Sequence, residues 1–256
     1  MSTFRRRLAS AREGGGKGLL GTWVKLPSFE TLQLIGHAGF EFVVIDMEHA
    51  PHSLQRAVEL VFCAQAMDMG ALVRLADDSG ATVQPLLDGG ADGLLVPRVT
   101  SPDRAAAIAR RMVFAPDGER GLGMTSRAGR WGLGPMKDYV ARGRDIARII
   151  QLEDWKSIEK AQSFASLPDV NGLFIGHGDL LLSSGKPASD PAVRQLTAGM
   201  LDVTKRAQIL SGVAVAEPEA AREHLAQGFS LVMLSNDTTI FGRAAAEAAA
   251  AVLSDR

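Results

Sequence analysis

The chain has 256 residues, of which 46% are hydrophobic and 22% charged, and 28 Lys and Arg stand against 29 Asp and Glu for a formal net charge of −1. This composition is that of a globular protein and excludes wholesale disorder. The balanced charge argues against a nucleic-acid partner, because proteins that neutralise phosphates normally carry a basic face or tail.

The first 17 residues form a basic segment, which we interpret as solvated. It contains Arg5, Arg6, Arg7, Arg12 and Lys17 against the single acid Glu13. No apolar run of signal-peptide length follows, and no stretch of 18 apolar residues could span a bilayer. We therefore expect a cytoplasmic protein with no membrane partner.

Short apolar runs rich in β-branched residues recur eight times along the chain, which predicts strands at 20–25, 41–46, 71–76, 93–99, 147–153, 172–176, 212–216 and 231–236. Segments with helical spacing lie between them, at 53–67, 79–87, 103–112, 157–165, 191–209, 218–226 and 238–252. The only cysteine, Cys63, lies in one of these helical patterns, and we expect its side chain to pack in the core. A single cysteine excludes an internal disulfide and a cysteine zinc site. An open doubly wound sheet shares this alternation. We favour an α/β fold of the closed (β/α)8 TIM-barrel type, with residues 1–256 as one domain, because eight such units in about 250 residues match that barrel.

Capping residues and glycines support these boundaries. Side-chain oxygens that could cap helix starts belong to Ser28, Ser53, Ser79, Ser101, Ser157 and Asp190. Glycines that could end helices in the left-handed conformation are Gly39, Gly70, Gly90 and Gly228.

One connection, at about 114–145, is much longer than the others and contains seven glycines and five arginines. Loops of this length are usually functional or disordered. Because Arg120, Arg127 and Arg130 lie beside Trp131, we interpret the segment as an ordered loop that faces an anion or a neighbouring subunit, with a helical turn at 135–143. A plain surface loop is the alternative.

Polar side chains collect where the predicted strands end, although the strand interiors are almost wholly apolar. They are Trp23, Lys25, Asp46, Glu48, His49, Arg74, Arg98, Gln151, Glu153, His177, Asp179, Asn236 and Asp237. Barrel enzymes carry their chemistry at the carboxyl ends of the strands, so these groups predict one catalytic rim.

Two of these acids, Glu153 and Asp179, follow neighbouring strands and could share a hard divalent cation such as Mg²⁺, with waters completing its shell. Salt bridges to Arg74 or Arg98 are the alternative reading of the same acids. Arg74 lies inside an apolar strand, where an unpaired charge costs several kcal/mol, so it requires an anion. A ligand carboxylate or enolate fits the planar guanidinium in a bidentate manner, and pairing with a rim acid alone is the alternative. His49 follows Asp46 closely, and the carboxylate could orient the imidazole for proton transfer.

Several segments together resemble the HpcH/HpaI family of metal-dependent (class II) pyruvate aldolases, the 4-hydroxy-2-oxoheptanedioate and 2-keto-3-deoxy sugar acid aldolase type. They are residues 21–23, 45–51, 73–74, 94–97, 118–121, 130–131, 151–153 and 174–180. The resemblance extends from about residue 18 to 250. It implies a TIM barrel of the phosphoenolpyruvate/pyruvate type and an aldolase that cleaves 4-hydroxy-2-oxo acids to pyruvate, or hydroxypyruvate, and an aldehyde.

The resemblance also implies roles for residues around the reacting ketone. Glu153 and Asp179 hold Mg²⁺ or Mn²⁺, with Co²⁺ as a further option, and Arg74 bonds the keto oxygen as it becomes an enolate. Gln151 and the backbone N–H groups near Gly178 and Asp179 hold the pyruvate end.

Outside this centre, Trp23 lines the substrate site and His49, oriented by Asp46, is the acid/base. Asp88 supports a neighbouring subunit's site, and Arg120, in the long loop at about 114–145, is a further site candidate. The family forms homo-oligomers, typically trimer-based hexamers.

Departures from the family pattern lie beside the proposed metal. His177-Gly178 replaces the common Pro-Ala, and Asp154-Trp155 follow Glu153 where Thr is usual. His177 could therefore add a metal ligand or contact a substrate carboxylate. Three alternatives stay open: a Schiff-base aldolase that uses Lys25, a citrate-lyase-type or acyl-CoA lyase on the same fold, and a barrel that only binds.

Overall fold

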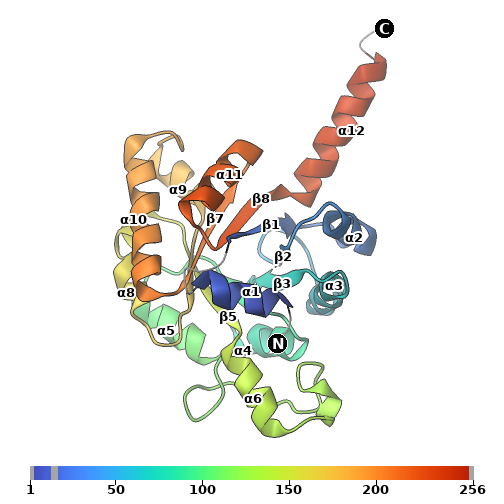
Figure 1. The fold of residues 1–256 in the computed structure, drawn as a ribbon, viewed down its shortest axis with the longest axis vertical. Coiled ribbons are helices and arrows are strands. Elements are labelled where there is room, and N and C mark those ends of the chain that lie inside the picture. The colour runs from blue at the N-terminus through green and yellow to red at the C-terminus, as the bar shows by residue number, and fades with distance from the viewer. Residues whose placement is uncertain (1–2, 13–16, 254–256) are drawn as a thin grey trace.

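The protein is a closed barrel of eight parallel strands surrounded by helices (Figure 1). The computed structural model describes residues 3–12 and 17–253. The strands are β1 (Leu19–Val24), β2 (Phe42–Asp46), β3 (Gly70–Arg74), β4 (Gly93–Val96), β5 (Ala147–Leu152), β6 (Gly172–Ile175), β7 (Leu210–Val215) and β8 (Leu231–Asn236). Each pairs in parallel with its neighbours in the chain, and β8 closes on β1. The predicted (β/α)8 fold and all eight strands are confirmed.

Helices connect the strands around the outside. They are α1 (Thr3–Arg12), α2 (Phe29–His37), α3 (Leu54–Ala66), α4 (Gly80–Asp88), α5 (Pro102–Arg110), α6 (Met136–Arg144), α7 (Trp155–Glu159), α8 (Ala161–Ala165), α9 (His177–Ser184), α10 (Pro191–Ala207), α11 (Pro218–Gln227) and α12 (Asp237–Leu253). The predicted helix at 157–165 is divided into α7 and α8. Across the described residues, no helix is long and apolar enough to cross a membrane.

The barrel interior is filled by large apolar side chains, among them Phe42, Leu72 and Phe174. Phe174 fits because β7 carries Gly212 opposite it, where a Cβ would lie 2.2 Å from the ring. A second apolar cluster lies between the strands and the outer helices, since alternate strand residues point outward. The rigid sheet that results fixes the positions of the strand ends.

The N-terminal segment is part of this core, which corrects the expectation of a wholly solvated segment. Phe4 and Leu8 of α1 are buried with the barrel interior, whereas Arg6 and Arg7 are exposed. Phe4 packs against the start of β3, so α1 closes the amino end of the barrel. The amphipathic spacing of the two apolar residues was the sequence signal.

Helix starts mostly follow the capping prediction. Ser28, Ser53, Ser101 and Asp190 accept backbone N–H groups in the first turns of their helices. Ser79 occupies the capping position of α4 without a side-chain bond. Ser157 is not a cap: it lies inside α7, and Asp154 caps that helix by accepting its N–H at 3.0 Å.

Three of the four predicted glycine stops have the expected left-handed backbone: Gly39, Gly90 and Gly228 have φ angles of 95°, 93° and 96°. Gly70 was wrong, because it begins β3 and the left-handed residue after α3 is Asp68, with φ 58°. The short polar side chain of aspartate tolerates that conformation.

The long glycine-rich segment lies at the amino end of the barrel, because it connects the end of α5 to the start of β5. Its predicted helical turn is confirmed as α6, preceded by the short 3-10 turn η1 (Arg130–Gly132). Trp131 and Leu133 are 67% and 89% exposed, so this segment presents apolar side chains outward.

The last helix, α12, leaves the barrel after its first turn and projects away from it (Figure 1). Ile240, Phe241, Val252 and Leu253 are exposed on it, together with a run of alanines. A helix that is apolar on most sides is normally buried.

Candidate active site

The carboxyl ends of β2 and β3 form the centre of the rim. Parallel pairing places Asp46 beside Arg74, and the guanidinium donates from Nε and Nη2 to the two carboxylate oxygens at 2.9 and 2.7 Å. Glu48 lies 3.1 Å from Nη1 of the same arginine. All three side chains are buried, and the anionic partners that the structure gives Arg74 are two rim acids of the protein itself, which is the alternative to a ligand anion.

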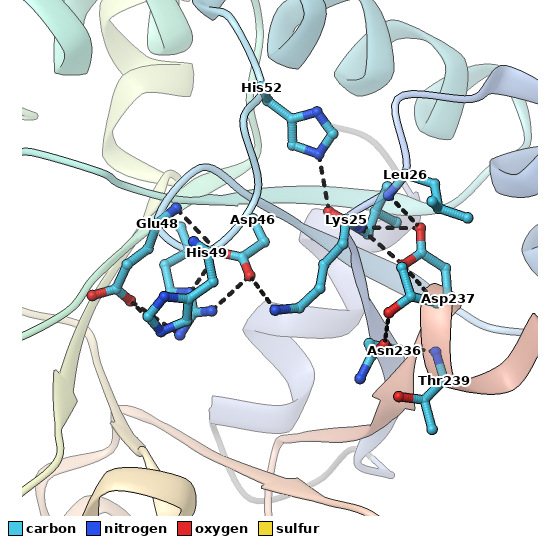
Figure 2. Close-up of polar contacts among 12 residues, drawn as sticks. Lys25, Leu26, Asp46, Glu48, His49, His52, Asn236, Asp237 and Thr239 are labelled. Atoms are coloured by element: carbon cyan, nitrogen blue, oxygen red, sulfur yellow. Dashed lines mark hydrogen bonds and ion pairs between the residues drawn. The ribbon is translucent and has the colours of Figure 1, made fainter. Parts of the chain in front are cut away.

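Lys25 adds a second cation to Asp46. Its Nζ reaches from the end of β1 to within 3.1 Å of Oδ2, as Figure 2 shows. Burial raises the pKa of Asp46, but the hydrogen bonds and charge of Arg74, the N–H of His49 and the charge of Lys25 outweigh it and lower the pKa to about 2. Asp46 is therefore a fixed anion at neutral pH.

Trp23 covers the guanidinium. The Arg74 Cζ lies 4.1 Å from the centre of the indole ring, and the indole meets Phe174 edge-on at 6.0 Å. Stacking and three polar contacts together leave Arg74 one orientation. Two of its five N–H groups donate to Asp46, and Nη1 lies toward Glu48 without a hydrogen bond.

His49 lies at the same rim but is not oriented by Asp46 in the way we expected. The Asp46 carboxylate accepts the backbone N–H groups of Glu48 and His49, at 3.1 and 3.2 Å, and so shapes the turn rather than the ring. The His49 imidazole, whose side chain is 55% exposed, lies 3.8 Å from Glu48 instead (Figure 2).

Glu48 and Arg98 were expected on the rim, but the sequence reasoning gave neither of them a role at the reacting ketone. Glu48 Oε1 lies 3.0 Å from Arg98 Nε, so this buried acid connects Arg74, Arg98 and the face of His49. The Arg98 backbone adopts the left-handed φ of 56° and donates its N–H to Glu153 at 2.9 Å. Their positions at strand ends were the signal, but nothing in the sequence revealed the partners.

Glu153 and Asp179 extend from the neighbouring strands β5 and β6, Asp179 within the first turn of α9. Glu153 does not form the alternative salt bridge to Arg74 or Arg98: it accepts the Arg98 backbone N–H and the Gln151 side-chain amide. A Cβ on Gly176 would lie 2.7 Å from Glu153 Cγ, so only glycine leaves room for this arrangement.

The electrostatics of these acids suit a cation. Burial raises the pKa of Glu153, and the nearby charges of Glu48 and Asp179 raise it further against the lowering effects of the Arg98 N–H and the Arg74 charge. Gln151 Oε1 is buried without a hydrogen-bond partner. Among the described residues no three His, Cys, Asp or Glu side chains form a ready metal cage, so a cation here would be held by two carboxylates and other oxygens. Such a donor set fits Mg²⁺, which keeps several waters.

His177 turns away from these carboxylates. Its Nδ1 lies 3.2 Å from the Ala214 carbonyl oxygen and its Nε2 3.2 Å from the Thr197 hydroxyl, between β7 and α10. Burial lowers its pKa. In this arrangement the imidazole cannot also be a ligand of the cation, which corrects that expectation.

Two other rim residues are structural. Asp237 accepts the backbone N–H groups of Lys25 and Leu26 at 2.9 to 3.0 Å, and Asn236 accepts the N–H of Thr239 at the start of α12 (Figure 2). They close the junction of β8 and β1 rather than face a ligand.

Asp88 and Arg120 lie at the opposite end of the barrel. Arg120 Nη2 lies 3.0 Å from Asp88 Oδ1, and the Tyr139 hydroxyl bonds both. Because Asp88 ends α4, these residues are separated from the rim of their own chain by the length of the barrel.

The sequence profile of the HpcH/HpaI aldolase/citrate lyase family matches residues 19–244. The chain belongs to this family. The predicted family membership is thus confirmed, and with it the assignment to the carbon–carbon lyases.

Named relatives of the family cover nearly the whole chain. A hydroxypyruvate/pyruvate aldolase of Deinococcus radiodurans is 32% identical over 261 residues, which span 97% of this chain and 89% of that protein. A 4-hydroxy-2-oxovalerate aldolase of Rhodococcus jostii is 30% identical over 247 residues, 95% and 93% of the two chains. The crystal structure of an HpcH/HpaI family protein from Burkholderia cenocepacia is 29% identical, with a TM-score of 0.87 over 98% of this chain and 99% of that one.

Proposed function

We propose that this HpcH/HpaI protein is a divalent-metal-dependent aldolase that reversibly cleaves a 4-hydroxy-2-oxo acid into pyruvate, or hydroxypyruvate, and an aldehyde. One observation carries the proposal: the charges of Asp179 and of the Arg74 guanidinium both act on the Glu153 carboxylate, so the two acids and the arginine share one end of the barrel. A cation held by Glu153 and Asp179 would thus contact the same ligand as the remaining N–H groups of Arg74. Relatives named as aldolases for pyruvate, hydroxypyruvate and 4-hydroxy-2-oxovalerate support the substrate class.

Cleavage of the bond beside a ketone requires that the departing electron pair be stabilised as an enolate. Bound Mg²⁺ or Mn²⁺ would act as a Lewis acid on the keto oxygen. Arg74 donates to the same oxygen, and one preorganised donor of this kind is worth about 3 kcal/mol. The partners Asp46, Glu48 and Trp23 hold the guanidinium in place before the reaction, so little reorganisation is required.

The pyruvate end would be held beside α9. This helix starts without a side-chain cap, so its first-turn N–H groups, including those of Gly178 and Asp179, are available to a carboxylate. Gln151 donates a hydrogen bond from its side-chain Nε2 to Glu153, and its Oε1 is buried without a hydrogen-bond partner. Trp23 forms the apolar wall of the site.

His49 would move the proton of the aldol hydroxyl. Its imidazole is half exposed, and its Nε2 lies 3.8 Å from Glu48. Cleavage requires removal of the hydroxyl proton, and condensation requires its return. Asp46 acts through the backbone of His49 and through Arg74, as a positioning residue.

We further propose that the protein is a homo-oligomer, a trimer-based hexamer. The exposed apolar faces of α12 and of the segment around Trp131 support this, because single chains rarely leave such helices uncovered. In such an assembly Asp88 and Arg120 would support the site of a neighbouring subunit.

The decisive experiment removes the cation. Chelator-treated protein should lose pyruvate release from a 4-hydroxy-2-oxo acid, and added Mg²⁺ or Mn²⁺ should restore it. Glu153→Gln should not be restored at the same metal concentration, while Glu159→Gln, an exposed acid on α7, serves as the matched control. Full activity after chelation would contradict the proposal.

A further inference from the structure

A second cavity lies at the amino end of the barrel, far from the catalytic rim. It has a volume of about 450 Å³ and is lined by the end of α3, the turn from α4 to β4, the long loop and α6. Pockets that hold small molecules are typically of this size, about 300 to 1,000 Å³. Phe4 of α1 and Ile146 at the entry to β5 form part of its apolar wall.

The lining is rich in positive charge. Four arginines, Arg120, Arg127, Arg130 and Arg142, face two aspartates, Asp68 and Asp92. One of the acids is already engaged: Asp92 Oδ2 accepts the Ala71 N–H at 3.1 Å and the Gln65 amide at 2.9 Å. Among the described residues, four guanidinium groups thus line the cavity against two carboxylates.

Arg120 is the most buried of these arginines, at 4% exposure. Only its Nη2 has acceptors, the Asp88 carboxylate and the Tyr139 hydroxyl. Nε and Nη1 have no hydrogen-bond partner among the described residues, and the guanidinium stacks on Phe114 at 4.3 Å. Buried donors without acceptors are costly, so they indicate an acceptor supplied from outside the chain.

Arg127 and Arg130 form no ion pair with a described carboxylate. Arg127 donates to the Gly89 carbonyl at 2.9 Å and is held against Gly90, where a Cβ would lie 2.4 Å from Nη1. Burial lowers the pKa of Arg127, and the Asp92 charge only partly offsets this effect. A bound anion would offset the free-energy cost of burying the Arg127 charge.

We propose that this cavity is a binding site for a small oxyanion, either a carboxylate or a phosphate, held by the guanidinium groups of the long loop. Arginine forks match both groups in a bidentate manner. The site lies at the opposite end of the barrel from the rim of its own chain and does not depend on the aldolase proposal.

Isothermal titration with inorganic phosphate and with succinate, at constant ionic strength set by NaCl, tests the proposal. We expect a Kd below about 1 mM for one of the two probes, and the probe that binds identifies the anion class. The exchanges Arg127→Gln and Arg130→Gln should each weaken binding about tenfold or more, whereas Arg194→Gln, an exposed arginine on α10, should not change it.

Because the rim also attracts carboxylates, the location must be observed directly. Crystals soaked in selenate should show an anomalous peak among the loop arginines, and Arg127→Gln crystals should lack it. The proposal is overturned by a selenate peak at the rim alone, by equal losses in Arg127→Gln and Arg194→Gln, or by the absence of binding to both probes. Melting temperatures show whether each variant is folded. If Arg127→Gln does not fold, Arg130→Gln still tests the proposal, because Arg130 lies at an exposed position.

Discussion

Replacement of Asp46 by asparagine tests the central claim that this carboxylate holds the catalytic guanidinium. In the native protein Asp46 is wholly buried and pairs with Arg74 and Lys25. The exchange keeps the size of the side chain but removes its charge, so Arg74 would keep only Glu48 as a charged partner. Breaking a buried ion pair from one side typically costs about 3 to 5 kcal/mol.

The lowered pKa of Asp46 gives a second measure of how much these contacts stabilise the folded protein. Its lowering from 3.8 to about 2 corresponds to about 2 kcal/mol of folding free energy at pH 7, since one pKa unit is worth about 1.4 kcal/mol. A carboxylate with a depressed pKa stabilises the fold above its unfolded value of 3.8. That contribution is lost as the pH falls through about 2, because the folded state must then also bind the proton.

Urea unfolding of the wild type and Asp46→Asn, followed from pH 7 down to the acid limit of folding, measures both effects. We expect the variant to be about 2 to 5 kcal/mol less stable at pH 7, with the difference shrinking below pH 4. Lys25→Met, which removes the more exposed partner, should cost at most about 1 kcal/mol. A difference under about 0.5 kcal/mol at pH 7 that does not vary with pH would refute the reasoning.

Four further outcomes follow from the rim. Arg74→Lys keeps the charge but loses the fork, so kcat for pyruvate release should fall about 100-fold or more, measured by coupled lactate dehydrogenase assay. His49→Asn should lower kcat by about 10² to 10⁴ with the melting temperature unchanged, since the ring is half exposed; an unaltered kcat would remove His49 from proton transfer. Because burial and the charges of Glu48 and Asp179 raise the pKa of Glu153, protons compete with the cation as the pH falls, and Mg²⁺ titrations at successively lower pH should show a weakening apparent affinity. Borohydride with pyruvate should leave no adduct on Lys25, whose amine is committed to Asp46; an adduct there would favour the Schiff-base alternative.

The fold could be predicted because each strand and helix carries its own local signal. The run that became β3 is apolar at every position except its last, and Ser53 caps α3 as expected. The failures have local causes as well. Asp154 and Ser157 are both good capping residues three positions apart, and sequence alone does not decide which one precedes the helix. The role of Phe4 depends on the space left by Gly70 on a distant strand.

The sequence could predict which residues lie at the strand ends of the site, but not which side chains pair with one another. Asp46 and Arg74 are 28 positions apart, and only the parallel register of β2 and β3 makes them partners. Glu48 could be placed on the rim from the sequence, whereas its contacts with Arg74 and Arg98 exist only in the closed barrel. The expected role of His177 was wrong for the same reason. Its partners Ala214 and Thr197 lie on β7 and α10, and only the folded barrel brings these elements beside it.

The charges of the rim bear on the order in which ligands bind. Four carboxylates, Asp46, Glu48, Glu153 and Asp179, face the cations Lys25, Arg74 and Arg98, which leaves one negative charge in excess. A cluster of this sign repels an oxo acid. A dication on Glu153 and Asp179 reverses the sign, and one monoanionic substrate then makes the cluster neutral. Coulomb energy in a partly buried site therefore favours metal before pyruvate, and the enolate would form where positive charge is already in place.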